Sequence, residues 1–174
     1  MNRTEILSRA SKYIMEDMLY LSKMREGKRK RNFFSPTFLE GLVYDAIDDV
    51  LREEGKKFSK INRAAYVTQD TLKQLENKNH RELVLEHIVC KNIYYSQLKD
   101  LLFTGKLTDN IIFEILDKYY ITALVTKRED QVLDAAGLRT KMVADGEWDG
   151  RNVFARYTAT NIKLIRNPYY IFEE

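Results

Sequence analysis

The sequence predicts an α+β fold that is predominantly helical, with a small two-stranded β element followed by a helix (ββα-like) and an N-terminal helical layer. Three observations lead to this prediction. Apolar residues recur at helical spacing through most of the first 55 residues. Two short apolar and β-branched runs, 83–89 and 120–125, are typical of strands. A helix-capping pattern follows the second run directly.

Composition supports a folded chain of one domain. The 174 residues are 44% hydrophobic and 32% charged, which is a globular balance. A single cysteine excludes an internal disulfide and a four-cysteine zinc site, and it predicts a reducing cytoplasm. No apolar run reaches the roughly 18 to 20 residues that cross a bilayer, so we expect no membrane association. The net charge of +3 permits nucleic-acid binding without requiring it.

Capping residues divide the N-terminal part of the chain into helices. Thr4 is the predicted N-cap of the first helix. A serine and a proline at 35–36 are typical of a helix start, and Gly55 is expected to end that second helix. Thr68 is the predicted cap of a shorter helix that ends near Glu76.

The remaining predicted elements follow in chain order. They are a strand over 83–89, a helix over about 92–103, a helix from Thr108 or Asp109, a strand over 120–125, a helix from Thr126 to Ala136 and a short helix around 153–158. We expect three consecutive segments: an N-terminal helical layer over 1–78, a ββα-like core with a helical insertion over 79–140, and a C-terminal segment over 141–174. Together they would make one compact domain.

An acidic residue and a histidine lie side by side near the end of the first predicted strand. His87 could act as a general base that deprotonates water. Glu86, with either Glu129 or Asp130 from the following helix, could supply oxygen ligands for a hard cation such as Mg²⁺ or Mn²⁺. A metal ion and a base together suit phosphodiester hydrolysis.

The segment Glu86-His87-Ile88-Val89-Cys90-Lys91 resembles the first motif of the HNH (ββα-metal) endonucleases. The resemblance implies that His87 is the general base and that Glu86 binds the metal. Cys90 stands where the family usually has proline, and the family's later asparagine and final histidine have no clear counterpart. A relative that keeps the scaffold without catalysis therefore remains open, as does chance similarity.

Other roles compete for the same side chains. Alternation along a strand places Glu86 and His87 on opposite faces, so both could reach one metal only at a strand end or a bulge. They could instead form an ordinary surface or hydrogen-bonded pair. Thr126 and Glu129 match a capping box, which leaves Asp130 as the helix-borne ligand.

Two charged segments are further candidates. Lys28, Arg29, Lys30 and Arg31 could hold nucleic-acid phosphates, or they could form a solvated loop or helix end. The acidic turn at 145–149 imitates the start of an EF-hand loop. We reject that motif because its twelfth position is an arginine rather than a glutamate.

Two functions fit these features about equally. The first is a nucleic-acid-directed protein with an HNH-like core, which in its enzymatic form would be a metal-dependent endonuclease. The alternative is a non-enzymatic small inhibitor or regulator that holds DNA, RNA or a nucleic-acid-processing protein through the basic run and its paired tyrosines. A structural assembly subunit is a third hypothesis, and it would show a large apolar patch. An enzyme needs His87 and two carboxylates to converge in the open, whereas a binding protein can bury His87.

Overall fold

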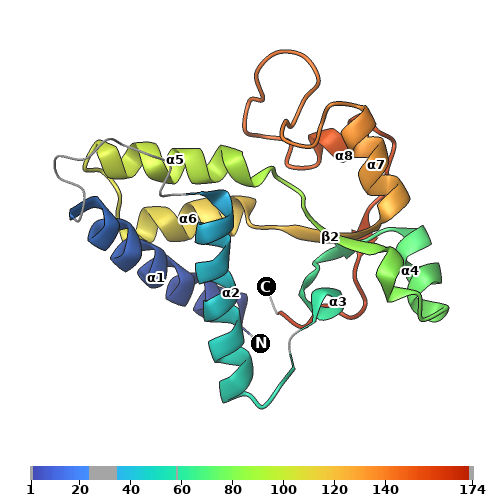
Figure 1. Ribbon diagram of the computed structural model, residues 1–174, viewed down its shortest axis with the longest axis horizontal. Coiled ribbons are helices and arrows are strands. Elements are labelled where there is room, and N and C mark those ends of the chain that lie inside the picture. The colour runs from blue at the N-terminus through green and yellow to red at the C-terminus, as the bar shows by residue number, and fades with distance from the viewer. Residues whose placement is uncertain (1, 24–34, 58, 173–174) are drawn as a thin grey trace. The chain divides into compact units, whose positions relative to one another are not determined.

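The computed structural model describes residues 2–23, 35–57 and 59–172. It confirms an α+β fold that is mostly helical with a small sheet (Figure 1). The chain divides into two compact units. Unit 1 comprises residues 1–58, 91–118 and 173–174, and unit 2 comprises 59–90 and 119–172. No helix in the described ranges is both long enough and apolar enough to cross a membrane.

This division differs from the three consecutive segments expected from the sequence. The helical insertion over 91–118 belongs with the N-terminal helices rather than with the strands that flank it. Its helix α5 (Lys91–Phe103) packs on α2 (Pro36–Glu53) in unit 1. Apolar helix faces find their partners by burial, not by chain order, and residue spacing within the insertion could not reveal that partner.

Unit 1 is built around the predicted N-terminal helices. Helix α1 (Arg3–Lys23) packs against α2, and the insertion adds α5 and most of α6 (Asp109–Tyr119). Ser35 caps α2 as predicted, because its hydroxyl accepts from the Phe38 N–H at 3.1 Å. The prediction of Thr4 as the first cap is wrong: α1 already includes Thr4, whose N–H donates to the Asn2 side chain at 2.9 Å.

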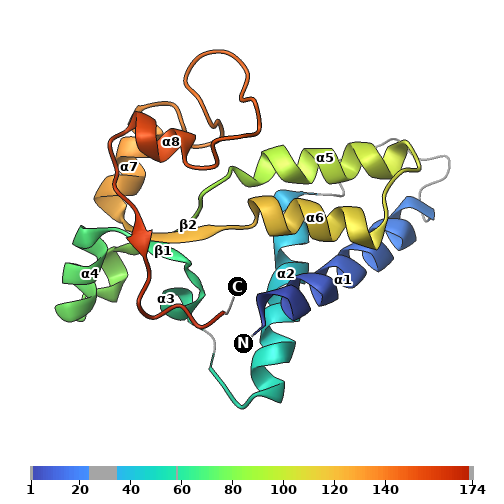
Figure 2. The same cartoon turned by 180° about the vertical axis from the view of Figure 1, so that it is seen from behind.

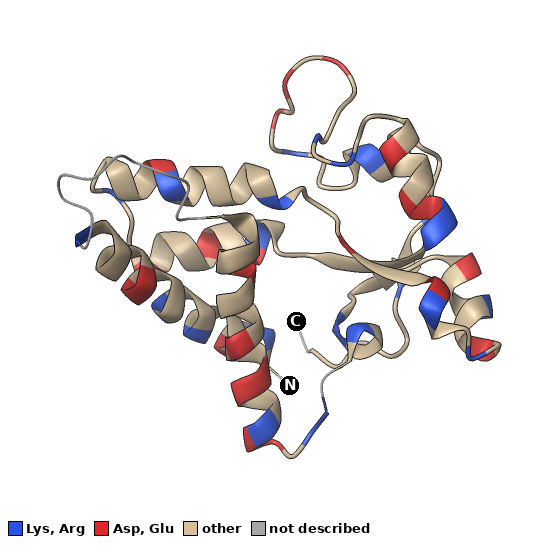
Figure 3. Ribbon diagram, viewed as in Figure 1, with Lys and Arg blue, Asp and Glu red and all other residues tan. Residues whose placement is uncertain are grey.

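Ion pairs join elements of unit 1 that are distant in sequence. Lys91 at the start of α5 lies 2.5 Å from Glu40 of α2, whose side chain is only 9% exposed. Arg9 of α1 holds Glu53 of α2 at 2.7 Å. Basic and acidic residues are interleaved along α1 and the end of α2 (Figure 3). Exposed pairs such as Arg9–Glu53 contribute little each, whereas the Lys91–Glu40 pair, which has a buried carboxylate, links α5 to α2.

Unit 2 is organised by a mixed sheet with strand order β2-β3-β1-β4. The predicted pair is present as β2 (Leu83–His87) antiparallel to β3 (Thr122–Thr126). Beyond β3 lie β1 (Tyr66–Val67), parallel to β3, and β4 (Ile165–Arg166), antiparallel to β1 (Figure 2). The two-stranded expectation missed β1 and β4 because two residues are too short for a period-2 pattern.

Helices cover both faces of this sheet (Figures 1 and 2). On one face, α7 (Lys127–Ala135) and α8 (Ala155–Ala159) supply Leu133 and Tyr157 to a core with Ala123 and Val125. On the other, α3 (Lys60–Arg63) and α4 (Gln69–Glu76) cover Leu124, with a 3₁₀ turn at His80–Glu82 leading into β2. Because β3 is covered on both faces, all five of its residues are buried, from Thr122 to Thr126.

Candidate functional site

The predicted strand–strand–helix order is present in unit 2. Glu86 lies opposite Ala123 and His87 opposite Thr122 in the antiparallel β2–β3 pair, and α7 begins immediately after β3. The His87 position is therefore the last residue of β2. This is the end of the strand at which two neighbouring side chains could converge on one ligand.

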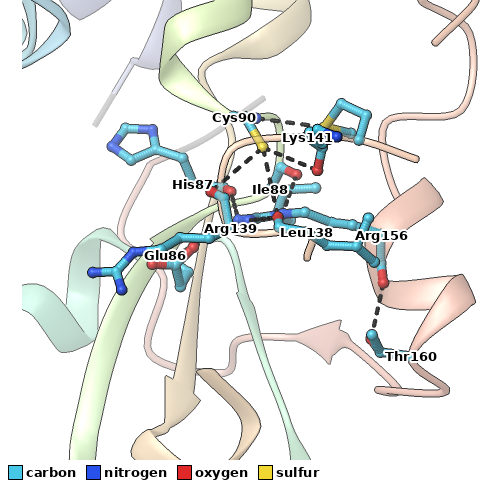
Figure 4. Close-up of polar contacts among 10 residues, drawn as sticks. Glu86, His87, Ile88, Cys90, Leu138, Arg139, Lys141, Arg156 and Thr160 are labelled. Atoms are coloured by element: carbon cyan, nitrogen blue, oxygen red, sulfur yellow. Dashed lines mark hydrogen bonds and ion pairs between the residues drawn. The ribbon is translucent and has the colours of Figure 1, made fainter. Parts of the chain in front are cut away.

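Arg156 of α8 binds Glu86, the carboxylate that was expected to hold a metal ion. Its guanidinium donates to the Glu86 carboxylate at 2.7 Å and to the backbone carbonyls of Ile88 at 3.2 Å and Leu138 at 3.1 Å. It also donates to the His87 carbonyl (Figure 4). The Arg156 side chain is 1% exposed. Arg156, itself a residue of α8, thus connects α8 to the end of β2 and to the loop that follows α7.

The electrostatics of this cluster give Glu86 a defined role. A buried guanidinium is costly unless it is paired and its N–H groups are satisfied, and these four acceptors meet that need. The Glu86 side chain, 25% exposed, supplies the negative charge that balances the Arg156 guanidinium. A carboxylate that neutralises a buried arginine is poorly available to a cation.

His87 is buried rather than open to solvent. The residue is 6% exposed, and its ring packs edge-on against Tyr120 at 5.3 Å between centroids. Its ring extends away from the Arg156 guanidinium, while its carbonyl faces that group (Figure 4). The side chains of Glu86 and His87 thus point to different sides, as strand alternation requires.

The carboxylates of α7 do not complete a metal site. Glu129 caps its own helix, as the capping-box pattern predicted. One of its oxygens accepts from the Thr126 N–H at 2.8 Å, the Thr126 hydroxyl at 2.8 Å and the Thr68 hydroxyl at 2.9 Å. Asp130 is half-buried in the first turn of α7. In the described ranges, no group of three His, Cys, Asp or Glu side chains could hold a metal ion, so His87, Glu86 and Asp130 are not brought together.

Cys90 has a structural role next to this cluster. Its thiol lies 3.4 Å from the Lys141 carbonyl and 3.8 Å from the Arg139 carbonyl. Its N–H is directed at the Met142 sulfur at 3.5 Å, a contact that proline could not make. Burial raises the pKa of the Cys90 thiol, with the Arg156 charge acting in the opposite direction. A thiol with a raised pKa is a poor nucleophile at neutral pH.

The other sequence candidates lie elsewhere or are buried. Lys28, Arg29, Lys30 and Arg31 fall outside the described residues. Of the paired tyrosines, Tyr169 is 53% exposed, whereas these are buried: Tyr94, Tyr95, Tyr119 and Tyr120. In the acidic turn, Trp148 donates to the Asn152 carbonyl at 3.1 Å, which anchors the loop. The pairs Tyr94–Tyr95 and Tyr119–Tyr120 therefore serve packing rather than a binding surface.

Tyr157, next to Arg156, is expected to make the stability of unit 2 sensitive to alkaline pH. Burial raises the pKa of its hydroxyl above the ordinary value near 10, although Arg156 acts in the opposite direction. A raised folded-state pKa stabilises the fold below about pH 10, and that contribution is lost as the pH rises further. We expect urea unfolding to show a steeper loss of stability above about pH 10 in the wild type than in Tyr157→Phe. The exposed Tyr169→Phe should behave like wild type, and an unchanged slope in Tyr157→Phe would refute the assignment.

Comparisons with known proteins identify no relative of this chain. No family model matches it, and neither a curated protein nor a solved structure matches it. The fold and the site together define an α+β unit with a mixed sheet. In this unit a buried arginine, Arg156, binds the ββα element that β2, β3 and α7 form. Sequence reasoning missed Arg156, because its partner Glu86 is 70 residues away and no local pattern joins them.

Proposed function

We propose that this chain is a non-enzymatic, nucleic-acid-directed binding protein of the inhibitor or regulator kind, built on a ββα unit like that of the HNH endonucleases. The observation that carries the proposal is the Glu86–Arg156 pair at 2.7 Å. In this pair Glu86, the expected metal ligand, is bound to the buried guanidinium of Arg156. Withdrawing Glu86 toward a cation would leave that charge uncompensated, which is strongly unfavourable.

The environment of His87 supports the same reading. A general base must reach a water molecule and a phosphate, but the His87 residue is only 6% exposed and packs on Tyr120. A protein that only binds has no such requirement. Burial of His87 therefore supports a binding protein over an enzyme.

The nucleic-acid part of the proposal rests on sequence. Lys28, Arg29, Lys30 and Arg31 form a continuous basic run, which suits phosphate contacts and counterion release. The resemblance of 86–91 to the HNH motif points to the same class of partner, either DNA or RNA or a protein that processes them. A reducing cytoplasm is the proposed setting, in keeping with the single cysteine.

A metal-dependent endonuclease is the second candidate, because β2, β3 and α7 follow the ββα order with His87 at the end of β2. In that case Glu86 and Asp130 would hold Mg²⁺ or Mn²⁺, and His87 would activate water. Glu86 would first have to leave Arg156.

One pair of assays tests both candidates. Supercoiled plasmid and single-stranded oligonucleotides are incubated with wild type and His87→Ala in Mg²⁺ or Mn²⁺, and binding is measured without metal. We expect no cleavage, and binding that weakens with salt. Replacing all four residues of the basic run with glutamine should reduce the log–log salt slope by roughly 0.7–0.9 for each phosphate that the variant no longer neutralises. Metal-dependent cleavage that His87→Ala abolishes would overturn the proposal in favour of the nuclease, and absence of binding at low salt would overturn its nucleic-acid part.

A further inference from the structure

A cavity of about 320 Å³ opens on the α8 side of the sheet in unit 2. Its size lies at the lower end of the range for small-molecule sites. The cavity is separate from the Glu86 carboxylate and the His87 ring, neither of which lines it. The lining residues are Tyr66, Phe154, Tyr157, Thr158, Ile162 and Leu164.

Aromatic and aliphatic side chains form most of the cavity wall. The rings of Tyr66 and Phe154 meet edge-to-face, with centroids 5.2 Å apart and planes at 76°. Both residues are half-buried, as are Ile162 and Leu164, although all four pack on the core of this sheet face. Ring surface that the fold leaves partly uncovered can receive a flat aromatic group by stacking.

Positive charge lies beside one wall. In the β1–β4 pair, Arg166 is the register partner of Tyr66, and its guanidinium carbon lies 4.8 Å from the centroid of the Tyr66 ring. Lys163 is exposed between two lining residues, and no lining residue is acidic. An aromatic wall with an arginine on it suits a ligand that has both a flat ring and an anionic group.

We propose that this cavity binds the base of a nucleotide, with the phosphate facing Arg166. The inference rests on the proposed nucleic-acid-directed function and names the part of unit 2 that would hold an unpaired base. Because the two rings are nearly perpendicular and the Arg166 guanidinium lies over the Tyr66 ring, the base would stack on Phe154. This stacking would supply most of the affinity and little sequence preference, because every base has a π-face.

The test uses the full chain and two small probes, AMP and adenosine, titrated by NMR chemical-shift perturbation. Phe154→Leu removes a ring but keeps apolar bulk, and Thr158→Trp fills the cavity from an exposed position. We expect each change to weaken AMP binding by about tenfold. Tyr169→Leu, an exposed aromatic outside the cavity, is the matched control and should bind like wild type. Arg166→Gln should weaken AMP by roughly fivefold and leave adenosine unchanged, because only AMP carries the phosphate.

A single-stranded deoxyadenosine oligonucleotide separates this inference from the proposed function. If the oligonucleotide binds equally to wild type, Phe154→Leu and Thr158→Trp, the chain is a nucleic-acid binder but the cavity assignment is wrong. If AMP binds and loses affinity in both variants while the oligonucleotide does not bind, the cavity assignment holds and the proposed function fails. Saturation of the cavity by N-acetyl-phenylalanine amide but not by AMP would overturn the inference in favour of a peptide ligand.

Discussion

Replacing Arg156 with leucine is expected to destabilise unit 2 by roughly 3–5 kcal/mol, the usual cost of breaking a buried ion pair by removing one partner. Leucine leaves the Glu86 carboxylate without its counter-ion. It also leaves the carbonyls of His87, Ile88 and Leu138 without this donor. The free energy of unfolding is measured by urea titration followed by circular dichroism.

Arg139→Leu is the matched control, because Arg139 pairs with Asp134 but its side chain is 75% exposed. It should change stability by less than about 1 kcal/mol. The double variant Arg156→Leu with Glu86→Leu should recover part of the loss, since it removes the uncompensated charge. A loss below about 1 kcal/mol for Arg156→Leu would refute the role given to this cluster, and with it the main support for a non-enzymatic function.

Replacing Glu129 with alanine is expected to cost roughly 2–3 kcal/mol, because three donors lose one charged acceptor. The Thr126 contacts cap α7, and the Thr68 contact links that cap to the residue that caps α4. Thr68 follows β1 and Thr126 ends β3, and these strands are parallel neighbours. The loss should therefore appear in both helices, as faster amide hydrogen exchange at the starts of α4 and α7.

The variant Asp130→Ala tests whether the effect of Glu129 on stability comes from its hydrogen bonds or from its negative charge near the N-terminus of α7. Asp130 shares the first turn of α7 with Glu129 but is not part of the capping box. It should cost only about 0.3–1 kcal/mol, the usual value of a charge near a helix N-terminus. Equal losses in the two variants would show that the dipole, not the hydrogen bonds, explains the effect of Glu129.

Local chemistry made much of this fold predictable. Ser35 caps α2 and Thr68 caps α4, and both could be read from a capping residue followed by apolar periodicity. The Thr126–Glu129 box also appears as expected. In each case the two hydrogen-bonded groups lie within four residues of each other. A short window of sequence therefore contains both partners of the stabilising interaction.

Features that depend on distant partners were not predictable. From the sequence alone, Glu86 could equally bind a metal ion or an arginine. Only the fold brings α8 next to β2, and no residue near Glu86 in the sequence identifies Arg156 as its partner. The same holds for β1 and β4, which are strands only because β3 and β1 supply their hydrogen bonds. A two-residue element has almost no preference of its own, so tertiary pairing decides its structure.

The position of the insertion over 91–118 also constrains the order in which the chain can fold. Strand β3 is hydrogen-bonded to both β2 and β1, so neither of those strands has a partner until β3 has left the ribosome. By then the chain has already supplied all four helices that the structure describes in unit 1. Pairing between strands so far apart in sequence is slow compared with helix formation. Unit 1 can therefore assemble during synthesis, before β3 is available. Until β3 emerges, the apolar residues of β1 and β2 remain exposed.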